Sequence, residues 1–216
     1  MANIKTCIFD LDGVICDTAK FHYIAWKQLA ATFGFNLTHE LDEQMKGIGR
    51  MQSLELMLDW AHLILTLAEK EALCEKKNRC FVESIQSITP SDMLPGVETF
   101  LNLLKENNYT IALGSASRNA PVILEKLGIT HFFDAIVDGN NVSIPKPNPA
   151  VFLKAAELTD TEPQHCIVFE DAISGVEAAL NAGMYVIGVG KPEILSKAHR
   201  CISTFEDISI QIFATL

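Results

Sequence analysis

The sequence predicts an α/β protein with a doubly wound parallel sheet and a small all-helical unit inserted after the first strand. Short apolar runs that end in polar or small residues recur along the chain, as expected for strands buried on both faces of a parallel sheet. Helical patterns lie between these runs, as in βαβ units. The region from about Lys20 to Ile88 differs, because it has helical periodicity and no convincing strand.

In chain order, the expected strands are Ile4–Leu11, Thr110–Gly114, Phe132–Val137, Cys166–Phe169 and Tyr185–Val189. Helical patterns precede the last four strands, over Val97–Lys105, Pro121–Leu127, Ala150–Leu158 and Gly175–Ala182. Ligands of doubly wound sheets bind beyond the carboxyl ends of the strands. Polar residues at those ends are therefore the candidates for function.

Inside the insert, helices are expected over Phe21–Phe33, Met51–Leu67 and Leu73–Ile88. Cys16–Lys20 is the expected outgoing linker, and the proline- and glycine-containing Ser87–Pro95 is the expected return linker. The predicted domains are a catalytic core of residues 1–16 and 94–216 and a helical cap of residues 17–93. Two short linkers around a compact insert predict a cap that hinges over a site at the sheet edge.

Composition limits the possible partners. The chain has 216 residues and a formal net charge of −10, which opposes binding to nucleic acid or to an anionic membrane. An anionic substrate therefore needs a basic site or a metal. The six cysteines show no CxxC or Cys/His ligand spacing, and the polar Met1–Thr6 does not resemble a secretory leader. We expect a soluble cytoplasmic protein, and a monomer, although no sequence feature determines the oligomeric state.

The strongest motif follows the first expected strand and has the sequence Phe9-Asp10-Leu11-Asp12-Gly13-Val14. Two carboxylates two residues apart project to the same side of a strand end, and the glycine allows a sharp turn. Two anions this close repel each other unless a cation or a proton lies between them. One aspartate alone would be interpreted as a cap of the following turn, but the whole hexapeptide after an apolar strand predicts a functional site.

Polar residues also follow three later strands. Ser115 and neighbouring backbone N–H groups could cradle a phosphate, with a serine-rich turn as an equal alternative. Lys146 stands between two prolines, which stiffen the chain and restrict the direction of its side chain. The alternative is an ordinary lysine in solvent at the surface. Glu170 and Asp171 leave a buried strand and offer hard oxygen ligands for Mg²⁺, with helix capping by Asp171 as the alternative.

Together these residues resemble the four signature motifs of the haloacid dehalogenase superfamily of phosphotransferases. The matching positions, in order at four strand ends, are Asp10, Asp12, Ser115, Lys146, Glu170 and Asp171. The resemblance covers the whole sheet portion, and the insert is similar to the small helical cap of that superfamily. It implies a phosphoryl-transfer enzyme.

Further stretches are similar to one branch of the superfamily, the β-phosphoglucomutases. They are Asp12–Ala19, His22, Ala25–Lys27, Met45–Arg50, Ser53–Leu54, Lys76–Asn78 and Ser115–Pro121. Two positions depart from that family: Gly49 stands where serine is common, and Arg118 stands where lysine is often found. The resemblance implies interconversion of β-glucose 1-phosphate and glucose 6-phosphate, with glucose 1,6-bisphosphate as intermediate and activator.

The resemblance also implies roles for the residues of the core. Asp10 is expected to attack phosphorus, and Asp12 to act as general acid and base. Mg²⁺ would be held by Asp10, the main-chain carbonyl of Asp12 and Asp171, with Glu170 in support. The residues expected to hold the transferring phosphate are Ser115, Ala116 through its backbone, and Lys146.

A second group is implied on the side of the cap. The residues expected to grip the phosphate that is not transferring are Arg50, Ser117, Arg118 and Asn119. Those expected to contact the sugar or to couple cap closure to chemistry are His22, Trp26, Lys46, Ser53 and Lys77. Thr18 and Gly47 are also expected to bind substrate or phosphate. From helical periodicity alone, Trp26 would be a core residue, and Lys46 and Arg50 could lie on a solvated face.

Two other functions remain open at this point. A sugar-phosphate phosphatase of the same superfamily needs the same core residues and differs only in the cap. A phosphosugar-binding regulator without catalysis has no need of a nucleophile, so the intact Asp10, Asp12, Lys146 and Asp171 argue against it. Phosphoenzyme formation from a small phosphodonor would distinguish the regulator from both enzymes.

Overall fold

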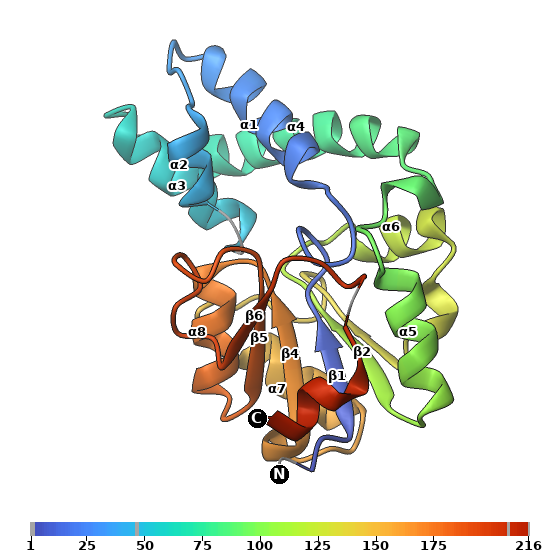
Figure 1. Ribbon diagram of the computed structural model, residues 1–216. Coiled ribbons are helices and arrows are strands. Elements are labelled where there is room, and N and C mark those ends of the chain that lie inside the picture. The colour runs from blue at the N-terminus through green and yellow to red at the C-terminus, as the bar shows by residue number, and fades with distance from the viewer. Residues whose placement is uncertain (1–2, 46–47, 207, 216) are drawn as a thin grey trace.

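The computed structural model describes residues 3–45, 48–206 and 208–215 and confirms the predicted α/β fold (Figure 1). One sheet of parallel strands has the order β3-β2-β1-β4-β5-β6. The strands are β1 (Thr6–Phe9), β2 (Thr110–Gly114), β3 (Ala135–Val137), β4 (Cys166–Glu170), β5 (Tyr185–Val189) and β6 (Arg200–Ile202).

Four strands differ from the prediction, β4 only because it extends one residue further, to Glu170. β1 is shorter than Ile4–Leu11, because the chain leaves the sheet after Phe9 and turns, with the amides of Ile15 and Cys16 donating to the carbonyl of Leu11. β3 begins at Ala135 because the preceding Thr130–Phe132 forms a 3-10 turn. β6 was not predicted, since this three-residue edge strand begins with an exposed arginine and contains no apolar run.

Helices cover both faces of the sheet. α5 (Val97–Glu106) and α6 (Ala120–Leu127) pack on one face, and α7 (Ala150–Leu158) and α8 (Ile173–Asn181) on the other. Phe9 and Phe169 point to the first face, where their rings stack with centroids 4.6 Å apart. Ile8 and Val168 point to the second face. Burial on both faces explains why these strands appear as continuous apolar runs.

Four helices between β1 and β2 form a cap with its own apolar core. They are α1 (Ala19–Ala31), α2 (His39–Glu43), α3 (Arg50–Trp60) and α4 (Leu67–Ser84). Trp26, Leu54 and Met57 are buried among them. In Figure 1 the cap stands over one end of the sheet, and both marked chain ends lie at the other. Within the described ranges, no helix is long and apolar enough to cross a membrane.

The predicted helix Met51–Leu67 is confirmed as far as Trp60 but is too long at its C-terminal end. α3 ends at Trp60, His62 adopts a left-handed φ of 54°, and α4 begins at Leu67 instead of Leu73. Thr66 and Glu69 form a capping box, in which the Thr66 amide donates to Glu69 Oε2 over 2.8 Å. This cap starts α4 six residues before the predicted helix Leu73–Ile88. The short α2, capped by Thr38, was also not predicted.

The two connections between the cap and the sheet lie side by side. Cys16 and Met93 form an isolated antiparallel bridge, and the Leu94 amide donates to the Ile15 carbonyl over 2.9 Å. Because the chain leaves and returns at one place, this paired connection is where a hinge between cap and core would act.

Candidate active site

The sheet topology gathers polar residues from distant parts of the chain. β1 lies between β2 and β4, and Phe9 is in register with Leu113 of β2 and Phe169 of β4. The residues just beyond these positions, Asp10, Ser115 and Glu170, therefore meet at the carboxyl edge of the sheet. This is the switch point of the strand order, where doubly wound folds bind ligands.

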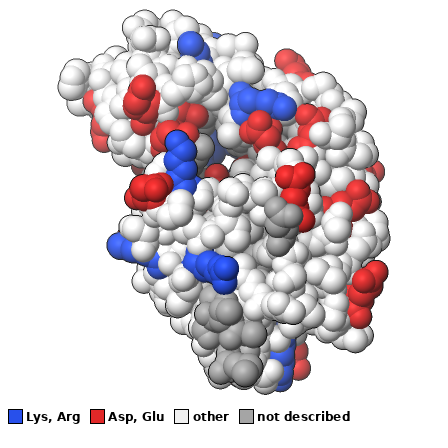
Figure 2. All heavy atoms as spheres, viewed as in Figure 1, with Lys and Arg blue, Asp and Glu red and all other residues white. Residues whose placement is uncertain are grey.

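A cavity of about 950 Å³ lies between this edge and the cap. Of the predicted site residues, its lining contains Asp10, Asp12, His22, Trp26, Arg50, Ser53, Lys77, Ser115, Ala116, Ser117, Arg118, Asn119, Lys146 and Asp171. Thr18 and Glu170 are fully buried and lie outside the lining. Lys46 and Gly47 lie outside the described residues. On the face shown in Figure 2, acidic and basic side chains of the described residues are interspersed around the hollow between cap and core.

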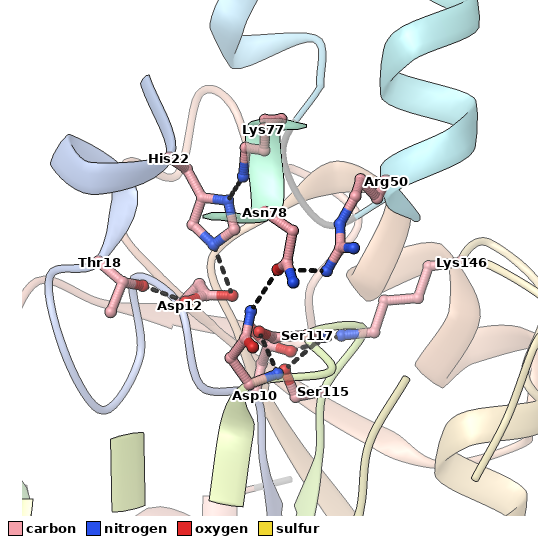
Figure 3. Close-up of polar contacts among 11 residues, drawn as sticks. Asp10, Asp12, Thr18, His22, Arg50, Lys77, Asn78, Ser115, Ser117 and Lys146 are labelled. Atoms are coloured by element: carbon pink, nitrogen blue, oxygen red, sulfur yellow. Dashed lines mark hydrogen bonds and ion pairs between the residues drawn. The ribbon is translucent and has the colours of Figure 1, made fainter. Parts of the chain in front are cut away.

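At the floor of the cavity, Lys146 joins two carboxylates. Its Nζ donates to Asp10 Oδ1 over 2.7 Å (Figure 3). It also donates to Glu170 Oε1 over 2.6 Å, and the Lys146 side chain is only 1% exposed. Burial alone would lower the pKa of Lys146, but the charges of Asp10 and Glu170 raise it above its ordinary value. Lys146 therefore stays positively charged beside Asp10. Its Nζ also lies 4.7 Å from the ring centroid of Phe152, a contact that sequence reasoning missed.

Two glycines leave room for carboxylates at this edge. Gly13 has a φ of +78°, and a Cβ at that position would collide with the carboxylate of Asp171. A Cβ at Gly175, in the first turn of α8, would collide with the carboxylate of Glu170. The absence of side chains at both positions lets Asp171 approach the Asp10–Gly13 turn and lets Glu170 lie beneath Lys146.

The donors at this edge fit Mg²⁺. The described residues contain no group of three or more His, Cys, Asp and Glu side chains close enough to form a complete metal cluster. Mg²⁺ rarely needs one, because it commonly binds one or two carboxylates and completes its shell with water and substrate phosphate. Asp10 and Asp171 line the same cavity and offer hard carboxylate oxygens, and Asp12 adds a backbone carbonyl.

Asp12 has surroundings different from those of Asp10. It accepts a hydrogen bond from the Thr18 hydroxyl, and His22 Nε2 lies 3.7 Å from its Oδ2. Burial, followed by the charge of Asp10, raises the pKa of Asp12 to about 6, against the opposing effect of Thr18. The predicted contact of Thr18 with substrate stays a prediction; in the structure Thr18 is buried, outside the cavity lining, and its hydroxyl bonds the Asp12 carboxylate.

His22 and Lys77 form a buried polar pair in the cap. Lys77 Nζ and His22 Nδ1 are 2.7 Å apart, and Lys77 also lies over the rings of Trp26 and Phe81, 4.9 and 4.6 Å from their centroids. Burial and the neighbouring Lys77 hold the pKa of His22 well below its ordinary value. Burial and Arg50 lower the pKa of Lys77 to about 7. A neutral His22 that accepts at Nδ1 carries its proton at Nε2, on the side of Asp12.

A polar network crosses the boundary between cap and core. Asn78 of α4 accepts from Arg50 Nη2 over 2.8 Å (Figure 3). It also accepts from Asn119 Nδ2 over 3.1 Å. Arg118 donates from Nε to the carbonyl of Gly139 over 3.2 Å. Arg50, Arg118 and Asn119 line the cavity, and this basic end lies between the cap helix α3 and the loop before α6. Sequence reasoning assigned no role to Asn78, although it adjoins Lys77 on the inner face of α4.

The serine-rich turn is ordered by its own hydroxyls, and its expected role in holding a phosphate stays a prediction. Ser115 Oγ accepts from the amide of Ser117 over 3.1 Å, and Ser117 Oγ accepts from the amide of Asn119 over 3.3 Å. The hydroxyls thus order the turn, while both serines also line the cavity. Trp26 is likewise both a member of the cap core and part of the lining. Ser53 is buried and donates to the carbonyl of Gly49 over 3.3 Å.

Comparison with known proteins gives consistent matches over most of the chain. The model of the haloacid dehalogenase-like hydrolases matches residues 4–183. A β-phosphoglucomutase of Bacillus subtilis is 41% identical over 97% of this chain and 93% of its own. A phosphorylated carbohydrates phosphatase of Thermotoga maritima is 30% identical over 84% and 82%. The crystal structure of a β-phosphoglucomutase from Clostridium difficile superposes with a TM-score of 0.94 at 40% identity, covering 98% of this chain and 96% of that one.

Proposed function

The chain belongs to the haloacid dehalogenase-like hydrolases, and we propose that it interconverts β-glucose 1-phosphate and glucose 6-phosphate. The observation that carries the proposal is the single cavity with two ends suited to phosphate. Asp10, Ser115 and Lys146 line its floor, and Arg50 and Asn119 line its basic end, between cap helix α3 and the loop before α6. A hexose bisphosphate needs both ends at once, whereas a phosphatase needs only the first.

Phosphoryl transfer would begin at Asp10. One carboxylate oxygen attacks phosphorus, an acyl phosphate forms on Asp10, and the bond from phosphorus to the sugar oxygen breaks. Lys146 is charged and 2.7 Å from Asp10 Oδ1, so it is placed to offset negative charge where the transferring phosphate gathers. Ser115 and the backbone of Ala116 offer further hydrogen bonds to the same phosphate oxygens.

Asp12 would move the proton. The departing sugar oxygen takes a proton from the Asp12 carboxyl, and the carboxylate takes one back when a sugar hydroxyl attacks the acyl phosphate. A pKa of about 6 suits this exchange, because it keeps both protonation states accessible near neutral pH. The hydroxyl of Thr18 fixes the orientation of the carboxyl group.

Mg²⁺, if bound at Asp10, Asp171 and the carbonyl of Asp12, would offset charge on the transferring phosphoryl group. Glu170 supports this arrangement indirectly. Its carboxylate is bound to Lys146 over 2.6 Å and to the amide of Ala172 over 2.8 Å, and it does not line the cavity. We assign it the task of holding Lys146 in place.

The second phosphate would be held at the cap side by Arg50, Arg118 and Asn119. A guanidinium presents paired donors that match phosphate oxygens. The intermediate, a hexose 1,6-bisphosphate, must turn over in the cavity so that its other phosphate faces Asp10. The cavity that would hold the bisphosphate has a volume of about 950 Å³.

The alternative is hydrolysis of a sugar phosphate. It is favoured by the 30% identity to the Thermotoga maritima phosphatase of phosphorylated carbohydrates, and it uses the same residues of the core. Hydrolysis would need water, and not a sugar hydroxyl, to attack the phosphorylated Asp10.

An NMR-monitored assay distinguishes the two functions. The protein is incubated with each anomer of glucose 1-phosphate, Mg²⁺ and a trace of glucose 1,6-bisphosphate. We expect glucose 6-phosphate to form from the β-anomer and not from the α-anomer. Inorganic phosphate as the main product would refute the isomerase and support the phosphatase.

A further inference from the structure

Asn78 is a polar residue on a helix face that otherwise packs inward. Cys74, Lys77 and Phe81 of α4 are buried, and Asn78 shares their face because residues three and four positions apart lie side by side on a helix. A polar side chain in such a stripe needs a partner. The amide oxygen of Asn78 has two: Arg50 Nη2 at 2.8 Å and Asn119 Nδ2 at 3.1 Å.

These two partners come from different parts of the fold. Arg50 is the first residue of cap helix α3, and Asn119 precedes α6 of the core. One oxygen therefore bonds a donor on each side of the boundary. Arg50 and Asn119 line the cavity but Asn78 does not, so Asn78 lies behind the two donors and not between them and a ligand.

We propose that Asn78 is a positioning residue that aligns Arg50 and Asn119 as one donor pair for the phosphate that is not transferring. The inference rests on the proposed function of that end of the cavity. A guanidinium has five N–H donors and a primary amide has two, so the bonds to Asn78 leave donors on both groups for a phosphate.

The bond across the boundary has a consequence for cap closure. Asn78 moves with the cap, and Asn119 is part of the core, so opening the cap must break the 3.1 Å contact between them. The donor pair then exists only when the cap is closed. The distant phosphate would in turn favour closure, since it binds the closed arrangement more tightly than the open one.

The test compares two phosphodonors for Asp10. Glucose 1,6-bisphosphate carries a second phosphate that reaches the Arg50 end, and acetyl phosphate does not. Single-turnover release of glucose monophosphate or acetate gives kcat/KM for each donor, and their ratio isolates the contribution of that end. The ratio is measured for the wild type, Asn78→Ala, Asn78→Asp and Asn102→Ala. Asn102 is the matched control, because its amide lies on the exposed face of α5 and donates only to the Glu98 carbonyl.

For Asn78→Ala we expect the ratio of bisphosphate to acetyl phosphate kcat/KM to fall about tenfold, since hydrogen bonds to charged groups are lost. For Asn78→Asp we expect about a hundredfold fall, because a carboxylate would engage Arg50 itself and repel the phosphate. Asn102→Ala should keep the wild-type ratio. Thermal unfolding followed by circular dichroism checks that each variant is folded, and if Asn78→Ala is not, the nearly isosteric Asn78→Asp is used for the test.

An unchanged donor ratio in Asn78→Ala would overturn the inference, because a purely structural residue would affect both donors alike. Equal falls of the ratio in Asn78→Ala and Asn78→Asp would also overturn it, because a purely structural residue would not distinguish the two variants. The outcome is separate from that of the proposed function. If the wild type hydrolyses hexose phosphates without isomerising them, the isomerase proposal fails, yet the donor ratio still reports on Asn78. If the wild type isomerises and the ratio does not respond, only the inference on Asn78 fails.

Discussion

Replacement of Lys146 by methionine removes an ammonium from between two buried carboxylates and keeps most of its aliphatic stem. Nζ lies 2.7 Å from Asp10 Oδ1 and 2.6 Å from Glu170 Oε1, and the exposed fractions of the three side chains are 1%, 6% and 0%. Removing one partner of a buried ion pair costs about 3–5 kcal/mol, because an uncompensated charge remains. We expect Lys146→Met to lower the free energy of unfolding by about that amount at pH 8.

The loss should depend on pH. Burial raises the pKa of Glu170 above its ordinary value, and Lys146 opposes that rise. A group with a raised folded-state pKa contributes stability that is present below its unfolded pKa and is lost as the pH rises through its folded pKa. Without Lys146 this folded-state pKa rises further, so more stability is lost between acid and neutral pH. Glu170 can take up a proton at pH 5, and the difference between wild type and variant should therefore be smaller there than at pH 8.

The measurement is urea unfolding of wild type and Lys146→Met in metal-free buffer at pH 5 and pH 8, followed by far-UV circular dichroism. Lys197→Met is the matched control: its ammonium bonds Glu177 at 2.6 Å, but the two side chains are 64% and 34% exposed. Exposed pairs contribute about 0–1 kcal/mol, so this variant should change little. A loss below about 1 kcal/mol for Lys146→Met at pH 8, no larger than that of an exposed pair, would refute the reasoning. Equal losses at both pH values would refute the assignment to Glu170.

Three further predictions concern catalysis. Asp10→Asn should abolish turnover and leave the fold intact, because the amide is nearly isosteric but lacks the nucleophilic anion; substantial activity, after controls for deamidation, would contradict the nucleophile. Asp12→Ala should slow transfer to and from sugar hydroxyls far more than phosphorylation of Asp10 by acetyl phosphate, whose good leaving group hardly needs an acid. Equal losses in the two reactions would mean that Asp12 does not move the proton. Arg50→Ala should lower kcat/KM for isomerisation by about two orders of magnitude, as expected for a charge-assisted pair worth roughly 3 kcal/mol, and should affect acetyl phosphate far less. Arg50→Lys should recover only part of the loss. A parallel fall in both reactions would assign Arg50 to cap closure in general.

The predicted helix and strand bounds were correct where a local run of apolar residues marks the element. Thr110–Gly114, Tyr185–Val189 and Ala150–Leu158 have their predicted bounds, because a strand or helix buried in the core is marked by its own apolar residues. The sequence Thr66-Leu-Ala-Glu69 carried the capping-box signature that would have moved the start of the next helix from Leu73 back to Leu67. β6 had no such signal, since a short edge strand is held by its neighbour β5 and not by its own composition.

The residues of the candidate site also fall into those that local sequence patterns mark and those whose positions depend on tertiary contacts. Asp10, Ser115, Lys146 and Asp171 could be selected from the sequence, because each follows an apolar strand and parallel strands end at one edge. The sequence also contained Thr18 and Glu170, but their positions behind Asp12 and beneath Lys146 depend on contacts that no spacing describes.

The order of apolar runs and of the polar residues that follow them was enough to predict strands β1 to β5, the helical insert and a polar edge of the sheet as the candidate site. Only the tertiary structure decided how the cap meets that edge. Asn78 and Asn119 are 41 residues apart in the chain and belong to different parts of the fold, yet a 3.1 Å hydrogen bond joins them. Local patterns record which face of a helix is buried, because burial follows the helical period. They do not record which side chain lies opposite, because that depends on how two separately packed units come together.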